Sequence, residues 1–148
     1  MMAALFRILL ITGGCILLYI IGNPLLEKIR YKWSGQTVEG RVIGFRGSKS
    51  SKTVFEKNTA RKHKGRRSRR PVFRYPVAPA SLDSLDGFSG SAILIPWFNY
   101  EINDKVEVVM HKDDPEKAHI FGIGLIFTDL LLLAFCVFMI FLGFYKRT

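Results

Sequence analysis

The stretch Ile120–Tyr145, IFGIGLIFTDLLLLAFCVFMIFLGFY, decides the fold of this 148-residue chain. It holds 26 residues, of which only Asp129 is charged. As a helix rising ~1.5 Å per residue it reaches about 39 Å, more than the ~30 Å hydrocarbon thickness of a bilayer. A helix of a soluble core need not be apolar on every side for this length, so the stretch predicts a transmembrane helix. Lys146 and Arg147 end it at a polar surface, with Tyr145 at headgroup level.

Four residues of this stretch recur at intervals of seven, namely Gly122, Asp129, Cys136 and Gly143. Heptad spacing places them on one face and predicts a helix–helix interface in which small residues let a second backbone approach. Asp129 falls near the middle of the predicted span, where an ionisable group faces protein or a water-filled cavity. We favour a protonated carboxyl that hydrogen-bonds a neighbouring helix over an ion or proton pathway, because pathways normally need several ionisable groups.

Residues 3–26 form a second apolar segment. We predict a retained transmembrane helix rather than a signal peptide, because no small-x-small cleavage site follows the apolar run. In an antiparallel pair of helices, Thr12, Gly13 and Gly14 fall at about the depth of Asp129. These three residues therefore join the predicted interface, with the Thr12 hydroxyl as the nearest partner for the Asp129 carboxyl.

Between the helices lies the segment 27–119, enough chain for one small domain. Its first residues predict a collar at the membrane surface, with cationic and aromatic groups suited to lipid headgroups. The predicted lipid-contacting residues are Lys28, Arg30, Tyr31, Lys32 and Trp33.

Apolar residues then predict several short strands. We expect a strand at 37–45, one at a sheet edge at 71–79 because of its prolines, a buried one at 89–97 and a half-buried one at 105–111, with a loop at 80–87. The predicted fold class is a membrane protein of the α+β type: two antiparallel transmembrane helices, 3–26 and 120–145, flank a small antiparallel sheet or barrel of four to five strands.

Several short motifs occur in a recognisable order before the last helix. They are Gly40-Arg41-Val42, Pro71-Val72-Phe73-Arg74-Tyr75, Val106-Glu107-Val108 and Asp114-Pro115-Glu116-Lys117-Ala118. In this order the chain resembles the uncharacterised bacterial membrane proteins grouped as domain of unknown function 3592. The resemblance implies two transmembrane helices around a small β domain. It implies no activity, so no functional residues are carried over.

Residues 46–74 form a strongly basic insertion. They contain twelve Lys or Arg residues and one acid, Glu56, whereas the whole chain has a net charge of +10. The predicted anion-binding residues are Arg61, Lys62, Lys64, Arg66, Arg67, Arg69 and Arg70. Anionic lipid headgroups are the nearest phosphates for a membrane-tethered loop. An acidic protein surface, nucleic acid and an inert solvated loop remain alternatives, and nucleic acid is disfavoured because no aromatic residues are interleaved for base stacking.

Catalytic and metal-binding patterns are not recognisable in the sequence. His111 with Asp113 and Asp114 is the nearest approach to a metal site, and a solvated turn explains these residues equally simply. Cys15 and Cys136 both fall in the predicted helices, where they suit close packing. We therefore predict a protein that is not an enzyme and has no cofactor.

The predicted function is that of an accessory or modulatory subunit, which binds another membrane protein or a second copy of itself. An immunity-type protein that neutralises a bacterial toxin is the alternative, by analogy alone, and lipid or nucleic-acid binding through the basic insertion is a third. The resemblance implies a bacterial membrane protein, and we expect it in the inner membrane. Lys and Arg counts beside the two helices favour a β domain in the cytoplasm.

Overall fold

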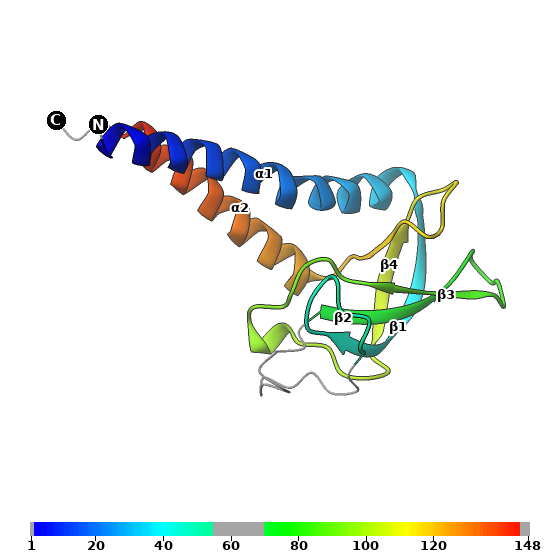
Figure 1. Ribbon diagram of the computed structural model, residues 1–148. Helices are drawn as coiled ribbons and strands as arrows, with labels where there is room; N and C mark the ends of the chain where they lie inside the picture. Colours follow the sequence, from blue (N-terminus) through cyan, green and yellow to red (C-terminus); the bar gives the residue numbers. More distant parts are fainter. Residues whose placement is uncertain (1, 55–69, 146–148) are drawn as a thin grey trace.

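The computed structural model describes residues 2–54 and 70–145, which form two helices and one sheet (Figure 1). Helix α1 spans Met2–Ser34 and helix α2 spans Ile123–Phe144. The helices form a hairpin, and the start of α1 and the end of α2 lie together at its tip, away from the sheet (Figure 1). At ~1.5 Å per residue, α1 is about 50 Å long and α2 about 33 Å. Each is long and apolar enough to cross a membrane.

Five strands form one antiparallel sheet with the order β3-β2-β1-β4-β5. They are β1 (Gln36–Arg46), β2 (Arg70–Pro76), β3 (Ser84–Phe88), β4 (Lys105–Met110) and β5 (Ala118–Ile120). The register of β1 against β2 shifts between Val42 and Gly44, and such a bulge increases the local twist. The sheet curls into a half-barrel whose edge strands β3 and β5 come close together. The predicted α+β layout is confirmed.

The hydrophobic core fills the concave side of this half-barrel. Inward side chains alternate along β1, as the period of two in a strand requires. The buried cluster consists of Val38, Val42, Phe45, Phe73, Tyr75, Ile93, Val106, Val108, Met110, Ala118, Ile120 and Leu125. Because Leu125 lies in the first turn of α2, this helix is anchored in the core of the β domain.

The predictions for segments 89–97 and 80–87 are wrong. Segment 89–97 contains no strand and leads into the 3-10 turn η1 (Pro96–Phe98), whereas segment 80–87, predicted as a loop, contributes most of β3. Asp-Gly is typical of a turn. In the sheet, however, Gly87 lies opposite Phe73, and a Cβ on Gly87 would be 2.7 Å from Phe73 Cζ. The phenylalanine ring therefore covers a position that only glycine leaves free.

The predicted edge position of segment 71–79 is also wrong, because β2 lies between β1 and β3. Its prolines are tolerated since Pro71 and Pro76 stand near the two ends of the strand, where few ladder hydrogen bonds are lost. The basic insertion begins later than predicted, because Arg46 belongs to β1, and it ends earlier, because β2 starts at Arg70. Residues 55–69 of the insertion lie outside the described residues.

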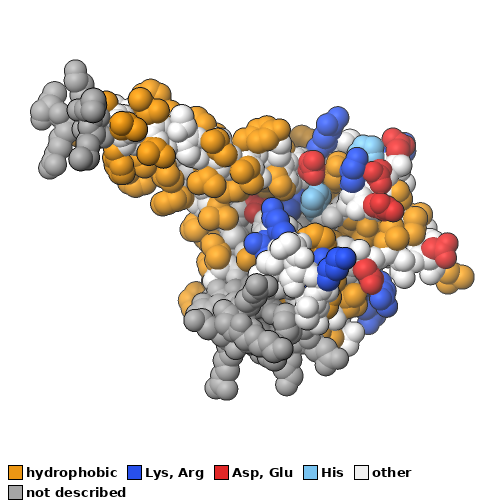
Figure 2. Space-filling model, viewed as in Figure 1, with side chains coloured by type: hydrophobic (Ala, Val, Ile, Leu, Met, Phe, Trp, Pro, Cys, Tyr) orange, Lys and Arg blue, Asp and Glu red, His pale blue; other side chains and the backbone are white. Residues whose placement is uncertain are grey.

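Large apolar side chains cover the outer surface of the helical hairpin (Figure 2). The exposed ones include Leu5, Phe6, Ile8, Leu9, Ile16, Tyr19, Ile20 and Leu26 on α1, and Ile123, Phe127, Leu130, Leu131, Phe135, Phe138, Phe141 and Phe144 on α2. The helices bury only one narrow face against each other, and the rest of their apolar surface has no cover within the described part of the chain.

Candidate functional site

Helix α1 continues eight residues beyond the predicted end at residue 26 and stops at Ser34. Residues 27–34 contain no glycine or proline that would break a helix. Gly35 ends it, with its N–H bonded to the Tyr31 carbonyl at 2.9 Å and no room for a Cβ beside the Met110 carbonyl oxygen. This extension carries Lys28 and Tyr31 into the interior of the protein, where they are 3% and 6% exposed.

The Asp129 carboxylate is the point at which three parts of the chain meet. Lys28 Nζ lies 2.5 Å from Asp129 Oδ2, and the Ser91 hydroxyl donates to Asp129 Oδ1 at 2.5 Å. Asp129 is 2% exposed, so this ion pair is shielded from water. Helix α1, helix α2 and the loop after β3 are thereby joined by a single carboxylate.

The predicted contact between Thr12 and Asp129 is wrong. The Thr12 hydroxyl donates to its own helix, at the Ile8 carbonyl 2.8 Å away. Asp129 lies in the second turn of α2, near the sheet, and not at mid-span. Because α1 is longer than predicted, the antiparallel register brings Lys28 to Asp129 and leaves Thr12 much closer to the hairpin tip.

Three residues of the predicted helix interface lie in the close contact between α1 and α2: Gly14, Cys136 and Gly143. A Cβ on Gly14 would lie 2.7 Å from Ile140 Cγ1 and 3.2 Å from the Cys136 carbonyl oxygen. A Cβ on Gly143 would lie 2.5 Å from Ile11 Cγ1. Glycine at both positions is therefore what lets the two backbones approach.

Two predicted members of this interface lie elsewhere. Gly122 precedes α2 and packs on the Tyr100 hydroxyl. Gly13 faces open space, because a Cβ added there would have no neighbouring atom within 4 Å. Heptad spacing alone therefore placed Gly122 on the wrong contact, since the helix begins only at Ile123.

A cavity of about 440 Å³ lies where the helices meet the sheet, and we call it the junction cavity. Its lining residues are Ile20, Ile21, Pro24, Lys28, Lys49, Arg70, Phe88, Gly90, Ser91, Ala92, His119, Asp129 and Leu132. Three cationic side chains and one carboxylate are among them, which leaves an excess of positive charge. Lys and Arg side chains are visible at this junction, next to the apolar surface of the helices (Figure 2). The volume is within the range of small-molecule sites.

His119 of β5 borders this cavity. Its Nε2 donates to Glu27 Oε2 at 3.1 Å, and its ring stacks on Tyr31 with 5.8 Å between centroids. Burial lowers the pKa of His119 below its usual value, although the hydrogen bond to Glu27 opposes this change. At neutral pH the imidazole is therefore uncharged, and the contact with Glu27 is a hydrogen bond.

The predicted anion-binding residues are only partly within the described structure. Arg61, Lys62, Lys64, Arg66, Arg67 and Arg69 lie outside the described residues. Arg70 is the first residue of β2, lines the junction cavity and donates from Nη1 to the Gly90 carbonyl. Burial lowers the pKa of the Arg70 guanidinium below its usual value, which lies so far above neutrality that the group stays charged.

The predicted lipid-contacting collar needs correction at two residues. Lys28 pairs with Asp129 and Tyr31 packs on His111 and His119, so neither faces outward. Both lie on the face of α1 that also buries Leu25, at helical spacings of three. The helical spacing of Leu25, Lys28 and Tyr31 in the sequence was the signal that could have identified this buried face.

The remaining residues of the collar lie at the surface. Arg30 and Trp33 are exposed, and Lys32 pairs with Glu107 of β4. The outward side of the last turns of α1 therefore keeps one cation and one large aromatic ring, the combination expected of a helix that ends near lipid headgroups.

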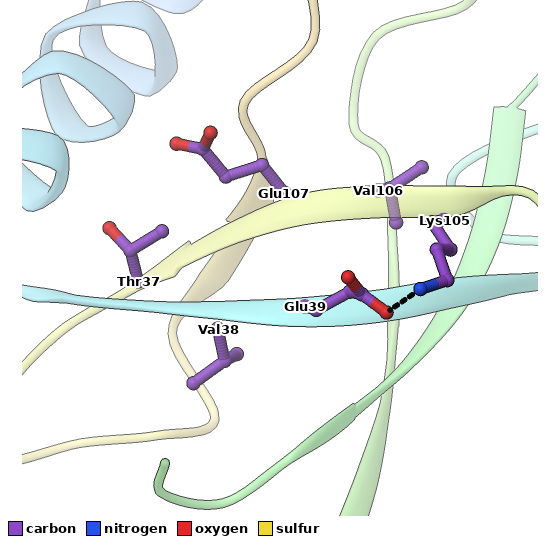
Figure 3. A pocket seen from close by; sticks show the side chains of 6 residues that line it. All are labelled: Thr37, Val38, Glu39, Lys105, Val106 and Glu107. Carbon is purple, nitrogen blue, oxygen red and sulfur yellow. Dashed lines mark ion pairs between the residues drawn. The ribbon is translucent and has the colours of Figure 1, made fainter.

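A shallower depression of about 390 Å³ lies on the outer face of β1 and β4. Figure 3 shows its lining residues, with Glu39 paired to Lys105 at 3.0 Å. Glu39 also lies directly opposite Glu107, which is neutralised by Lys32. The charges here are exposed and satisfied by one another, so the depression is a weaker candidate than the junction cavity.

Among residues 2–54 and 70–145, no three His, Cys, Asp or Glu side chains come together as a metal site would require. Ser91 and Lys28 at the junction were not predicted as partners of Asp129, because no local pattern links segments so far apart in the chain.

Comparison with known proteins adds no relative for this site. No protein-family model matches the chain, and no curated protein or solved structure matches it either. The resemblance to domain of unknown function 3592 stays a prediction, and the role of the junction has to be inferred from the chain's own residues.

Proposed function

We propose that this chain is a two-span protein of a bacterial inner membrane, which holds its β domain at the bilayer surface and serves, without catalysis, as an accessory or modulatory subunit of another membrane protein. The observation that carries the proposal is the apolar outer surface of the α1–α2 hairpin. Soluble monomers rarely expose so large a contiguous apolar patch. A bilayer covers such a surface, and α2 has the length of one span.

An exposed tryptophan supports this placement of the bilayer. Trp97 of η1 is 92% exposed, and its neighbour Phe98 packs on Phe127 of α2 with 6.0 Å between ring centroids. Trp97 therefore stands beside the first turns of α2, where the span would enter the membrane. Tryptophan is enriched at this level because its ring is amphipathic.

A groove on the hairpin supports binding to a partner helix. It has a volume of about 440 Å³ and is lined by Cys15, Leu18, Tyr19, Gly22, Asn23, Leu25, Leu26 and Leu133. Gly22 and Cys15 are small enough to let another backbone approach, as in other membrane helix pairs. Asn23 carries an amide on an otherwise apolar surface, and a partner helix would supply its hydrogen bonds.

The junction around Asp129 supports a modulatory role. The contact of Lys28 and Ser91 with Asp129 fixes the β domain to both helices. A partner that shifts either helix would therefore also move the sheet. This coupling suits a subunit that transmits a change at the membrane to its surface domain.

The test is co-purification in a mild detergent with a variant that fills the groove. A Cβ on Gly22 would meet only Leu133 Cδ2, at the ordinary contact distance of 3.9 Å, so Gly22→Leu adds a side chain to the groove where the described structure leaves room for its Cβ. Gly13→Leu adds the same side chain to α1 outside the groove and is the matched control.

We expect one membrane protein, or a second copy of this chain, to co-purify with the wild type and with Gly13→Leu but not with Gly22→Leu. Equal recovery of the partner with all three chains would remove the groove from the proposal. A chain that is released from membranes without detergent would refute the membrane placement itself.

A further inference from the structure

The junction cavity has one apolar side and one cationic side. Ile20, Ile21 and Pro24 of α1 and Leu132 of α2 form the apolar side. All four belong to the parts of the helices that carry exposed apolar surface, so this side of the cavity adjoins the proposed bilayer. Phe88 of β3 adds an aromatic ring from the sheet.

The cationic side is built around Gly90. Arg70, at the start of β2, donates from Nη1 to the Gly90 carbonyl. The Lys49 side chain approaches Gly90 from the loop after β1, with Cε and Nζ at 3.6 and 3.8 Å from the position that a Cβ on Gly90 would take. Both cations thus lie beside Gly90 and line the same cavity. Arginine and lysine are the residues that usually bind phosphate groups.

The charges of the cavity are not balanced by its own acids. Asp129 is already occupied by Lys28 and Ser91. No carboxylate in the described part of the chain forms an ion pair with Lys49 or Arg70. An anion that enters the cavity would therefore meet two positive charges that no acid of residues 2–54 or 70–145 neutralises.

We propose that the junction cavity binds the headgroup of one anionic glycerophospholipid, with the phosphate at Lys49 and Arg70 and the acyl chains along Ile20, Ile21 and Leu132. The cavity volume suits a headgroup, and the chains remain in the bilayer. A free phosphate would satisfy the cations but would leave the apolar side uncovered, so the lipid is favoured. The site rests on the proposed membrane placement and differs from the basic residues 61–69 of the insertion.

The test uses the full chain, purified in a non-ionic detergent and incubated with equal amounts of phosphatidylglycerol and phosphatidylcholine. Native mass spectrometry then counts each lipid bound per chain. The double variant Lys49→Gln/Arg70→Gln removes the cationic side. Arg74→Gln/Lys105→Gln is its control, because it removes the same charge from exposed positions on β2 and β4.

A steric variant tests the same site without changing charge. Gly90→Leu places a side chain in the cavity, and its Cβ would meet only the flexible Lys49 chain at ordinary contact distance. Glycerol 3-phosphate and inorganic phosphate, offered as competitors, distinguish a lipid site from a site for free phosphate.

We expect the wild type and the exposed-charge control to bind one phosphatidylglycerol in preference to phosphatidylcholine. The preference should fall roughly tenfold in Lys49→Gln/Arg70→Gln, because each cation near an anionic surface contributes substantially to binding, and Gly90→Leu should lose the lipid.

An unchanged preference in both variants would refute the site. The site would also be refuted if the preference for phosphatidylglycerol were lost only when the basic residues among 61–69 are neutralised. Displacement of the lipid by free phosphate at equal concentration would refute it as well. Unfolding curves of each variant show that the folded protein was tested, so failure here leaves the membrane placement standing.

Discussion

Lys28 and Asp129 form a buried ion pair between the two helices, with 2.5 Å between Nζ and Oδ2. The residues are 101 positions apart in the chain. Ser91 donates to the second carboxylate oxygen, so the pair also fixes the loop that follows β3. This contact therefore links both helices and the loop after β3.

Removal of one partner of the ion pair should strongly destabilise the protein. Asp129→Leu leaves the Lys28 ammonium buried without an anion, and we expect a loss of about 3–5 kcal/mol in the free energy of unfolding. Lys28→Met/Asp129→Leu removes both charges and should recover much of this loss. Denaturant unfolding in detergent measures both.

The control for this prediction is Lys105→Met. It breaks the exposed pair with Glu39 and should cost less than about 1 kcal/mol. If the double variant were as unstable as Asp129→Leu, the unpaired charge would not be the cause.

Because α1 packs closely on α2, a larger side chain at Gly14 should lower the stability of the hairpin. A Cβ there would lie 3.2 Å from the backbone oxygen of Cys136, which cannot move aside as a flexible side chain can. Gly14→Leu should therefore destabilise the hairpin by about 1–3 kcal/mol. Gly13→Leu, with open space around it, should change the thermal midpoint little, and similar effects of the two variants would argue against this helix contact.

Because of His119, the free energy of unfolding should decrease in mild acid. Its pKa is lowered in the folded protein, chiefly by burial, so the unfolded chain binds more protons as the pH falls. Stability should be complete above about pH 6.5, the ordinary histidine value, and should decline as the pH falls through the lower folded pKa. Unfolding curves between neutral and acidic pH measure this decline.

Two variants assign the acid effect to His119. His119→Gln should flatten the decline, because the titrating group is gone. Glu27→Ala removes the carboxylate whose hydrogen bond and negative charge raise the pKa of His119, so the decline should extend to lower pH. An unchanged profile in His119→Gln would place the titrating group elsewhere.

The β domain is predicted to face the cytoplasm, because more Lys and Arg residues flank the helices on that side. With Cys15 and Cys136 replaced by Ala, a cysteine at Ser50, which is exposed, should not react with a membrane-impermeant maleimide in intact cells. Labelling should appear after lysis. Strong labelling before lysis, with the outer membrane permeabilised, would reverse the orientation.

The layout of two apolar helices and a small sheet could be predicted from the sequence. Long apolar runs and alternating residues such as Val106 and Val108 can be recognised in the local sequence. The free energy gained when such residues are buried is non-directional, so it does not depend on which distant residues cover them. The same reasoning failed for Gly87, whose place in β3 depends on the Phe73 ring across the sheet.

The junction, by contrast, was decided by tertiary structure. Asp129 was recognisable as a costly group that needs a partner, but its partner depends on the length of α1 and on the register of the hairpin. Lys49 and Arg70 likewise meet at Gly90 only after the sheet has formed. Ion pairs and hydrogen bonds act over a few ångströms, so residues far apart in the chain acquire these contacts only when the core has brought their elements together.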